Sequence, residues 1–151
     1  MELTHKYLLR YYKMNQLCPV FRAKALVNQK FNGIQVGDWV VGSYIESGTD
    51  APCIIFGDGE QIEVDKTTLS QLIGVDRSNN PLYNNDIIEF DVVSTSHQQK
   101  SYGLVYFSNE CFAFKVKTST GEDNLDNLLG NSVGNQFDNS DLLQFIHVDK
   151  A

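Results

Sequence analysis

Side chains able to carry out chemistry are few in this sequence, and their spacing matches no familiar catalytic motif. The three histidines lie in unrelated contexts, at His5, His97 and His147, without an HxH, HxxxH or HExxH pattern. GxSxG, P-loop and GxGxxG motifs are lacking too, and no helix-forming run follows Gly57-Asp58-Gly59, which is typical of a turn. The sequence therefore predicts no metal and no cofactor.

Carboxylates are the remaining acid–base candidates. They can be grouped in three pairs: Asp58 with Glu60, Asp65 with Asp76, and Asp86 with Glu89. Because the chain has 19 acidic residues, such pairs arise by chance, and surface or turn roles are favoured. A catalytic group of Asp76, Tyr83 and Asp86 is an alternative, but a turn leading into a strand requires the same closeness. We expect Asp86 to hold a turn at Asn84-Asn85, and the protein not to be an enzyme.

The cysteines give no sign of a special site. Cys18, Cys53 and Cys111 are widely separated and form no CxxC pair, so neither a disulfide framework nor a zinc site is predicted. Cys53 and Cys111 fall within apolar strand patterns, where cysteine behaves as a small hydrophobe. Residues 1–19 lack the basic start, apolar block and cleavage site of a secretory signal, so a reducing, cytoplasmic location is expected.

Length and composition favour one soluble, acidic domain. The chain has 151 residues, of which 42% are apolar and 11% aromatic, and this composition excludes disorder. No apolar stretch approaches the roughly 20 residues needed to span a bilayer. Twelve basic and 19 acidic residues give a net charge of −7. Since nucleic-acid affinity depends on Lys and Arg neutralising phosphates, no nucleic-acid partner is expected.

The first segment, residues 1–19, is predicted to be an amphipathic extension containing a helix. Its apolar side chains recur at a spacing near four residues, at Leu3, Tyr7, Leu8, Tyr11, Tyr12 and Met14. Pro19 ends the helix. Such a stripe packs on its own domain or on another subunit; the rival interpretation, a membrane-surface helix, has only a few cations to support it, and no membrane contact is expected.

From Phe21 onward, short β-branched and aromatic runs bounded by turn residues predict a mainly β fold. The expected strands are residues 39–45, 53–56, 61–64, 86–93, 102–107, 111–116 and 132–137, with hairpins over 53–64 and 102–116. In the second hairpin, Phe112, Phe114 and Val116 should share one face.

Three segments have a helical pattern. Residues 67–73 fit either a turn of helix or a buried strand, and single helical turns are expected over 125–129 and 138–145. Asp138-Asn139-Ser140 supplies candidate caps for the last of these. Many short strands in one domain over residues 20–151 favour a small barrel or a sandwich.

The polar stretch from Gly74 to Ile88 is expected to form two turns rather than a binding site. Asp and Asn side chains bond to backbone two residues on, and Asn tolerates positive φ, so Asn79 or Asn80 can occupy a left-handed position. Pro81 then suits the start of a strand. Asn84-Asn85 repeats the arrangement before the strand at Asp86.

Three blocks of sequence, in the same order, resemble the YopX-like proteins of phages and prophages. Residues 64–88 resemble that family's T-x-G-Q-Y-x-G motif, its D-x-N-G turn and its I-Y-E-G-D-I-V segment. Residues 21–24 and 38–42 resemble F-R-G-K and E-W-V-Y-G, and residues 133–143 resemble I-G-N-I-Y-D-N-P-E-L-L. Ser70, Asn79 and Asn84-Asn85 replace motif residues, mostly at turns, and residues 1–20 lie outside the resemblance.

The resemblance implies a small SH3-like barrel of short strands with short helical additions, carried on mobile genetic elements. It implies no reaction, substrate or cofactor. The positions that carry it, which we expect to be structural, are Phe21, Arg22, Trp39, Gly42, Thr68, Gln71, Gly74, Asp76, Tyr83, Asp86, Ile87, Gly134, Asn135, Asn139 and Leu142.

The sequence leaves three functional hypotheses. The first is a non-enzymatic accessory protein that binds another protein or assembles with itself, because catalytic groups are few and the N-terminal apolar stripe has to be covered. The alternative is an acidic decoy that occupies the nucleic-acid site of a host enzyme, for which the charge of −7 is the motive. The third is an enzyme using Asp76, Tyr83 and Asp86.

Overall fold

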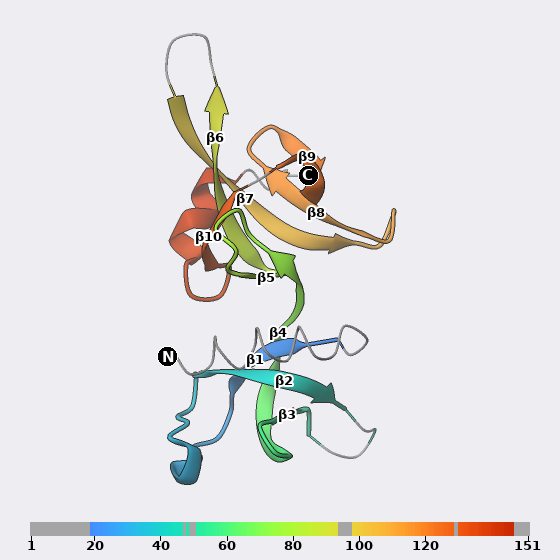
Figure 1. Cartoon of the computed structure of the whole chain (residues 1–151), viewed down its shortest axis with the longest axis vertical. Coiled ribbons are helices and arrows are strands. Elements are labelled where there is room, and N and C mark those ends of the chain that lie inside the picture. The colour runs from blue at the N-terminus through green and yellow to red at the C-terminus, as the bar shows by residue number, and fades with distance from the viewer. Residues whose placement is uncertain (1–18, 47, 49–50, 94–97, 129, 147–151) are drawn as a thin grey trace. The chain divides into compact units, whose positions relative to one another are not determined.

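The protein is mainly β, as the sequence predicts. A computed structural model describes residues 19–46, 48, 51–93, 98–128 and 130–146. In this part of the chain, antiparallel strands are joined by loops and by three short 3-10 helices (Figure 1). The helix predicted within residues 1–19 lies outside the described residues. None of the helices described has the length and apolar character needed to cross a membrane.

Contacts divide the chain into two compact units, residues 1–72 and residues 73–151, where the sequence predicts one domain over residues 20–151. Strand β4 (Glu60–Val75) runs through the boundary between them. It includes residues 67–73, so the helical alternative for that segment is wrong. The residues are too few there for periodicity to separate a helix from a buried strand.

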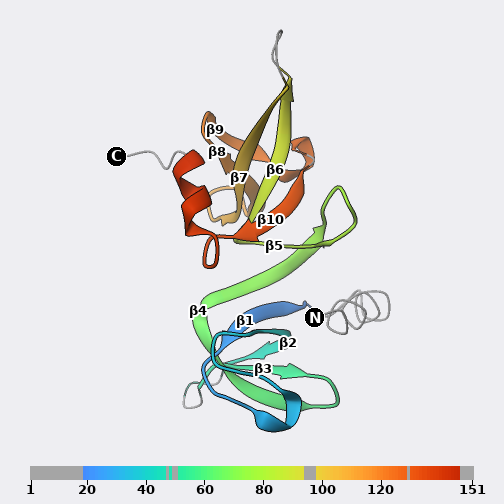
Figure 2. The same ribbon diagram turned by 90° about the vertical axis from the view of Figure 1, so that its left-hand side faces the viewer.

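In the first unit, four strands form a closed ring of hydrogen-bonded neighbours (Figure 2). Strand β1 (Phe21–Ala25) pairs with β2 (Trp39–Ile45), β2 with β3 (Cys53–Phe56), β3 with β4, and β4 with β1. Because each strand has a partner on both sides, the ring has no open edge. Its core consists of buried apolar side chains: Ala23, Ala25, Val40, Ile54, Ile62 and Val64.

The second unit contains a five-stranded antiparallel sheet in the order β10-β6-β7-β8-β9. Its strands are β6 (Asp86–Val93), β7 (Gln98–Ser108), β8 (Ala113–Thr118), β9 (Gly121–Asn124) and β10 (Asn131–Asn135). The short strand β5 (Pro81–Tyr83) follows β4 in the hydrogen-bonding order. A buried cluster forms the core of this unit: Leu82, Ile88, Val105 and Val116.

Two 3-10 helices occupy the segments where the sequence predicts helical turns. Helix η2 (Leu125–Asn127) contributes the partly buried Leu125 to the core cluster. Helix η3 (Ser140–Phe145) lies beside β7, where the ring centre of Phe145 is 5.6 Å from that of Tyr102. The predicted turns are therefore confirmed as short helices.

The strands predicted over residues 39–45, 53–56 and 86–93 are confirmed with those bounds, as is the hairpin over 53–64. Four other strands differ. Strand β4 covers residues 60–75 instead of 61–64, and β8 covers 113–118 instead of 111–116. The last one covers residues 131–135 instead of 132–137, and β7 begins at Gln98, before the predicted start at Tyr102. Residues 98–101 pair with β6 although they are polar, and alternation of apolar residues cannot reveal such a strand end.

Gly42 allows β2 to lie close to β3, because a Cβ at this position would overlap the carbonyl oxygen of Ile55. We expect Gly42→Ala to lower the free energy of unfolding by about 2 to 3 kcal/mol, as overpacking does in cores. Urea denaturation measures this change. The matched control is Gly48→Ala, where a Cβ would meet no atom within 4 Å. Equal stability of the two variants would contradict the role of Gly42.

Candidate functional site

The buried carboxylate of Asp76 holds three backbone amides. Its Oδ1 accepts hydrogen bonds from the N–H groups of Ser78 and Asn80, each at 2.9 Å, and its Oδ2 accepts one from the N–H of Ser132, also at 2.9 Å. The residue is only 7% exposed. Within the turn, Asn79 has a φ of 66°, so the predicted left-handed asparagine is confirmed. Asp76 closes its own turn and ties it to β10.

Asp86 holds the second turn, as expected from the sequence. It is 1% exposed, and its Oδ2 accepts a hydrogen bond from the N–H of Tyr83 at 2.9 Å. Asn85 has a φ of 72°, and its N–H donates to the carbonyl of Val105 at 2.7 Å. A short side chain that bonds to backbone two or three residues away is the usual stabiliser of such a turn.

Asn135 organises the chain where it leaves β10. Its Oδ1 accepts hydrogen bonds from the N–H groups of Phe137 and Asp138, each at 3.0 Å, and its own N–H donates to Oδ1 of Asn139 at 3.1 Å. A Cβ at Gly134 would overlap that same Oδ1, so this position requires glycine. Of the candidate caps Asp138, Asn139 and Ser140, it is Asn139 that occupies the N-cap position of η3, but its side chain makes no capping bond because its amide oxygen bonds to Asn135.

The middle and last blocks of the family resemblance meet in the second unit. Gln136 donates through Nε2 to Oδ1 of Asn85 at 2.7 Å and through its N–H to the carbonyl of Asn85 at 3.0 Å. Of the other block residues, Ile87 is buried and Leu142 is half-buried. The residues of these two blocks that belong to the second unit thus make the contacts of a structural framework, whereas Thr68 and Gln71 of the middle block belong to the first unit.

In the first unit the corresponding residues pack around the ring. The guanidinium of Arg22 lies 4.6 Å from the ring centre of Trp39, and the rings of Phe21 and Tyr44 are 5.9 Å apart. Gln71 lies opposite Phe21 in the ladder between β1 and β4. A cation over the face of an indole is an attractive contact even at a partly exposed position.

Thr68 fills an irregularity between β1 and β4. The register shifts between Arg22 and Lys24, so that a longer stretch of β4 lies opposite β1. The hydroxyl of Thr68 accepts a hydrogen bond from the N–H of Lys24 at 2.8 Å and donates one to the carbonyl of Asp65 at 2.7 Å. The hydroxyl thus bridges β1 and β4 at the point where their ladder is irregular.

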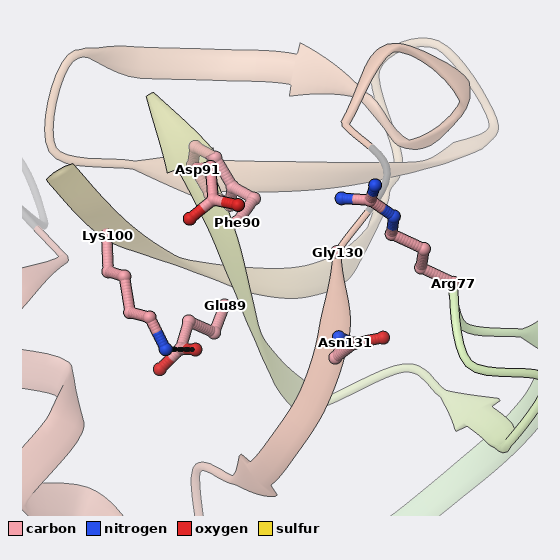
Figure 3. Close-up of a pocket in the computed structure, with 7 residues that line it drawn as sticks. All are labelled: Arg77, Glu89, Phe90, Asp91, Lys100, Gly130 and Asn131. Carbon is pink, nitrogen blue, oxygen red and sulfur yellow. Dashed lines mark hydrogen bonds and ion pairs between the residues drawn. The ribbon is translucent and has the colours of Figure 1, made fainter. Parts of the chain in front are cut away.

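A small polar hollow lies in the second unit, beside β6, β7 and the start of β10 (Figure 3). Its volume is about 130 Å³, and its lining residues are Arg77, Glu89, Phe90, Asp91, Lys100, Gly130 and Asn131. Nζ of Lys100 lies 2.7 Å from Oε1 of Glu89, and this contact lowers the pKa of Glu89 and raises that of Lys100. Two cations balance two carboxylates, so the hollow favours neither an anion nor a cation.

A larger, open groove of about 370 Å³ is lined by the apolar Phe90, Val92 and Leu128 and by the turn over residues 118–123. Among the described residues that line the hollow or the groove there is no cysteine, and Asp76, Tyr83 and Asp86 line neither of them. Within the described part of the chain, no three His, Cys, Asp or Glu side chains are grouped so that they could hold a metal ion. The histidines themselves lie outside it.

The connection between β1 and β2 presents an aromatic ring to solvent. Phe31, in the 3-10 helix η1 (Lys30–Asn32), is 91% exposed, and Val36 is 58% exposed. The loop is nevertheless ordered by hydrogen bonds. Gln29 and Ile34 exchange backbone bonds of 2.8 and 3.0 Å, and Oδ1 of Asn28 accepts the N–H of Val36 at 2.9 Å.

A second exposed ring lies at the tip of the β7–β8 hairpin. Phe112 and Cys111 belong to the turn and not to the strand predicted over 111–116, so the prediction that Phe112 shares a face with Phe114 and Val116 is wrong. Phe112 has a φ of 50° and is 80% exposed. A left-handed backbone costs a residue with a Cβ about 1 to 2 kcal/mol.

Compared with protein-family models, with curated proteins and with solved structures, the chain has no match.

Sequence reasoning missed both exposed rings as candidate functional residues. A signal exists for the first, because Phe31 is followed at once by Asn32-Gly33, and an aromatic residue within turn residues has no strand or helix to bury it. For Phe112 the alternation with Phe114 and Val116 points to the wrong conclusion. Only the backbone geometry reveals its position.

Substitutions of Asp76 test how much its carboxylate stabilises the second unit. We expect Asp76→Ala to lower the free energy of unfolding by about 3 to 5 kcal/mol, since three buried amides lose their acceptor. Asp76→Asn keeps one carbonyl oxygen and should cost roughly half as much. Chemical denaturation of the full chain measures both, and Asp58→Ala, at an exposed turn position, is the control. A fully stable Asp76→Ala variant would contradict the anchoring role.

Proposed function

We propose that the protein is a non-enzymatic protein-binding module, an accessory protein of the YopX-like kind encoded by a phage or prophage and acting in the cytoplasm of its host. The observation that carries the proposal is Phe31, a large aromatic side chain that is 91% exposed on an ordered loop. Aromatic residues are enriched among the few side chains that dominate protein–protein binding.

The loop is suited to binding because it is already in one conformation. Besides the bonds of Asn28 and Gln29, Oδ2 of Asp38 accepts the N–H of Gln35 at 2.9 Å, and Gly33 and Gly37 have φ values of 66° and 90°. A partner would therefore gain the area of the ring without the entropy cost of ordering a flexible loop. Leu26, Val27 and Val36 add exposed apolar area on the same connection.

We further propose that the closed ring of β1 to β4 is a small barrel of the SH3-like kind. The closure of four strands into a ring and the long, structured connection between the first two support this likeness. The family resemblance of the sequence points in the same direction. The fold alone selects no function, because barrels of this kind carry many.

The proposal is tested with Phe31→Ser in the full chain. We expect the variant to be as stable as the wild type, within about 0.5 kcal/mol, because the ring is exposed. Two measurements are made on the wild type and the variant: self-association by light scattering and the amount of protein captured from a host lysate. We expect the variant to reduce whichever of these the wild type shows by at least tenfold. Ile45→Ser, at another exposed apolar position of the first unit, is the matched control. A wild-type chain that stays monomeric and captures nothing contradicts the proposal.

The acidic decoy is a second candidate, favoured by the distribution of charge. Residues 73–151 contain five basic and eleven acidic residues, a net charge of −6. Residues 1–72 contain seven basic and eight acidic residues, a net charge of −1. The second unit thus has six of the seven net negative charges of the chain. A field of one sign attracts sites that bind polyanions.

The decoy hypothesis predicts that the protein competes with DNA for a host nuclease or polymerase, and that salt weakens the competition. The measurement is inhibition of the enzyme at 50 mM and at about 200 mM salt. Inhibition should fall by at least tenfold over this range. If DNA binding by the enzyme is unchanged at low salt, the decoy hypothesis is wrong and the first proposal is unaffected.

A further inference from the structure

The turn at the tip of the β7–β8 hairpin holds a residue that its backbone disfavours. Among the described residues other than glycine, three have positive φ: Asn79, Asn85 and Phe112. Asparagine tolerates this conformation because its side chain is short and polar, and a phenylalanine does not. Glycine or asparagine at position 112 would fit the same turn without strain.

Burial does not account for Phe112 either, since the ring is 80% exposed. Phe107 and Phe114 behave differently, because their rings lie 5.2 Å apart, edge to face, at the end of the sheet. The exposed ring of Phe112 therefore contributes little burial to the stability of the isolated chain, although its backbone conformation lowers that stability. Residues in such conformations cluster at binding sites, where the strain is offset by a function.

The turn itself contains one charged residue, the carboxylate Glu110. Burial together with a hydrogen bond to Glu122 and the charge of Glu110 raises the pKa of Tyr106 to about 12. Lys115 and Lys117 are the nearby cations on β8, and Nζ of Lys117 lies 5.6 Å from the ring centre of Tyr106. The second unit as a whole has a net charge of −6.

The charge narrows the class of partner. An anionic membrane surface is disfavoured, because a single ring adds little apolar area and interfacial binding also needs cations. Nucleic acid is disfavoured for the same electrostatic reason. A second copy of this chain has the same net charge of −7 and offers no complementary positive surface to the hairpin tip. A protein with basic residues around an apolar pocket fits better, because its charge is opposite to that of the second unit and its pocket can bury the ring.

We propose that the tip of the β7–β8 hairpin, residues 108–113, inserts the ring of Phe112 into an apolar pocket of a partner protein whose rim has lysine or arginine residues. This inference rests on the proposed protein-binding function and adds a surface in the second unit to the Phe31 loop of the first. Its signature is a residue that lowers the stability of the free chain and raises its affinity.

The first test is thermal stability. Phe112→Gly and Phe112→Asn remove the strain, so the melting temperature should rise by roughly 2 to 8 °C in the full chain. Phe145→Asn, at an exposed aromatic position of η3, is the control and should not raise it. A lower melting temperature for both Phe112 variants would show that the ring stabilises the free hairpin, and would overturn the inference.

The second test uses the photo-crosslinking residue benzoylphenylalanine at position 112, irradiated in a host lysate. We expect a product with a host protein whose cross-linked peptide comes from an apolar pocket flanked by Lys or Arg, and a yield that falls at high salt. Unlabelled wild type should compete for the product at least tenfold better than Phe112→Gly. Absence of a product, a product with a second copy, or equal competition by Phe112→Gly overturns the inference.

Competition by Phe31→Ser distinguishes this inference from the proposed function. If Phe31→Ser loses competition for a captured protein while Phe112→Gly retains it, the chain binds a protein but the hairpin tip takes no part. If benzoylphenylalanine gives a product neither at position 31 nor at position 112, both the inference and the proposed function fail.

Discussion

A carboxylate taken out of water has to be compensated by hydrogen-bond donors, and Asp76 meets this requirement with backbone amides from two distant segments. Ser132 lies 56 residues along the chain from Asp76, and Gln136 lies 51 residues from Asn85. The edge strand β10 has β6 as its neighbour in the sheet, so these polar contacts add a second attachment. The arrangement of the second unit depends on them, and their long separation in sequence adds to the loop-closure entropy that folding has to overcome.

The turns of the second unit show why asparagine can stand where a glycine would be expected. Asn79 and Asn85 both have left-handed backbones, which asparagine tolerates and glycine would adopt freely. Asn85 also uses its side chain, which accepts a hydrogen bond from Gln136. The substitution therefore keeps the shape of the turn and adds a link to the last part of the chain, which a glycine could not do.

Much of the fold could be predicted because β-branched and aromatic runs bounded by turn residues mark strands directly, as at residues 39–45 and 86–93. The turn roles of Asp76 and Asp86 followed from local chemistry, since these side chains reach backbone a few residues away. The division into two units could not be predicted, because it depends on contacts between segments far apart in sequence. The link of Asp76 to Ser132 could not be predicted for the same reason. The side chain of Asn139 can either cap the following helix or bond to Asn135, and the local sequence does not show which of the two forms.

The two units also differ in how their strands end. In the ring of the first unit every strand is paired on both sides, so it offers no template on which a foreign strand could add. The sheet of the second unit has two edge strands: β10, which has no charged residue, and β9, a strand of four residues that includes Glu122 and Asp123. Two like charges in so short a strand oppose stacking against a copy of itself. The two units thus limit the addition of a foreign strand by different means, closure in the first and, at the edge formed by β9, electrostatic repulsion in the second.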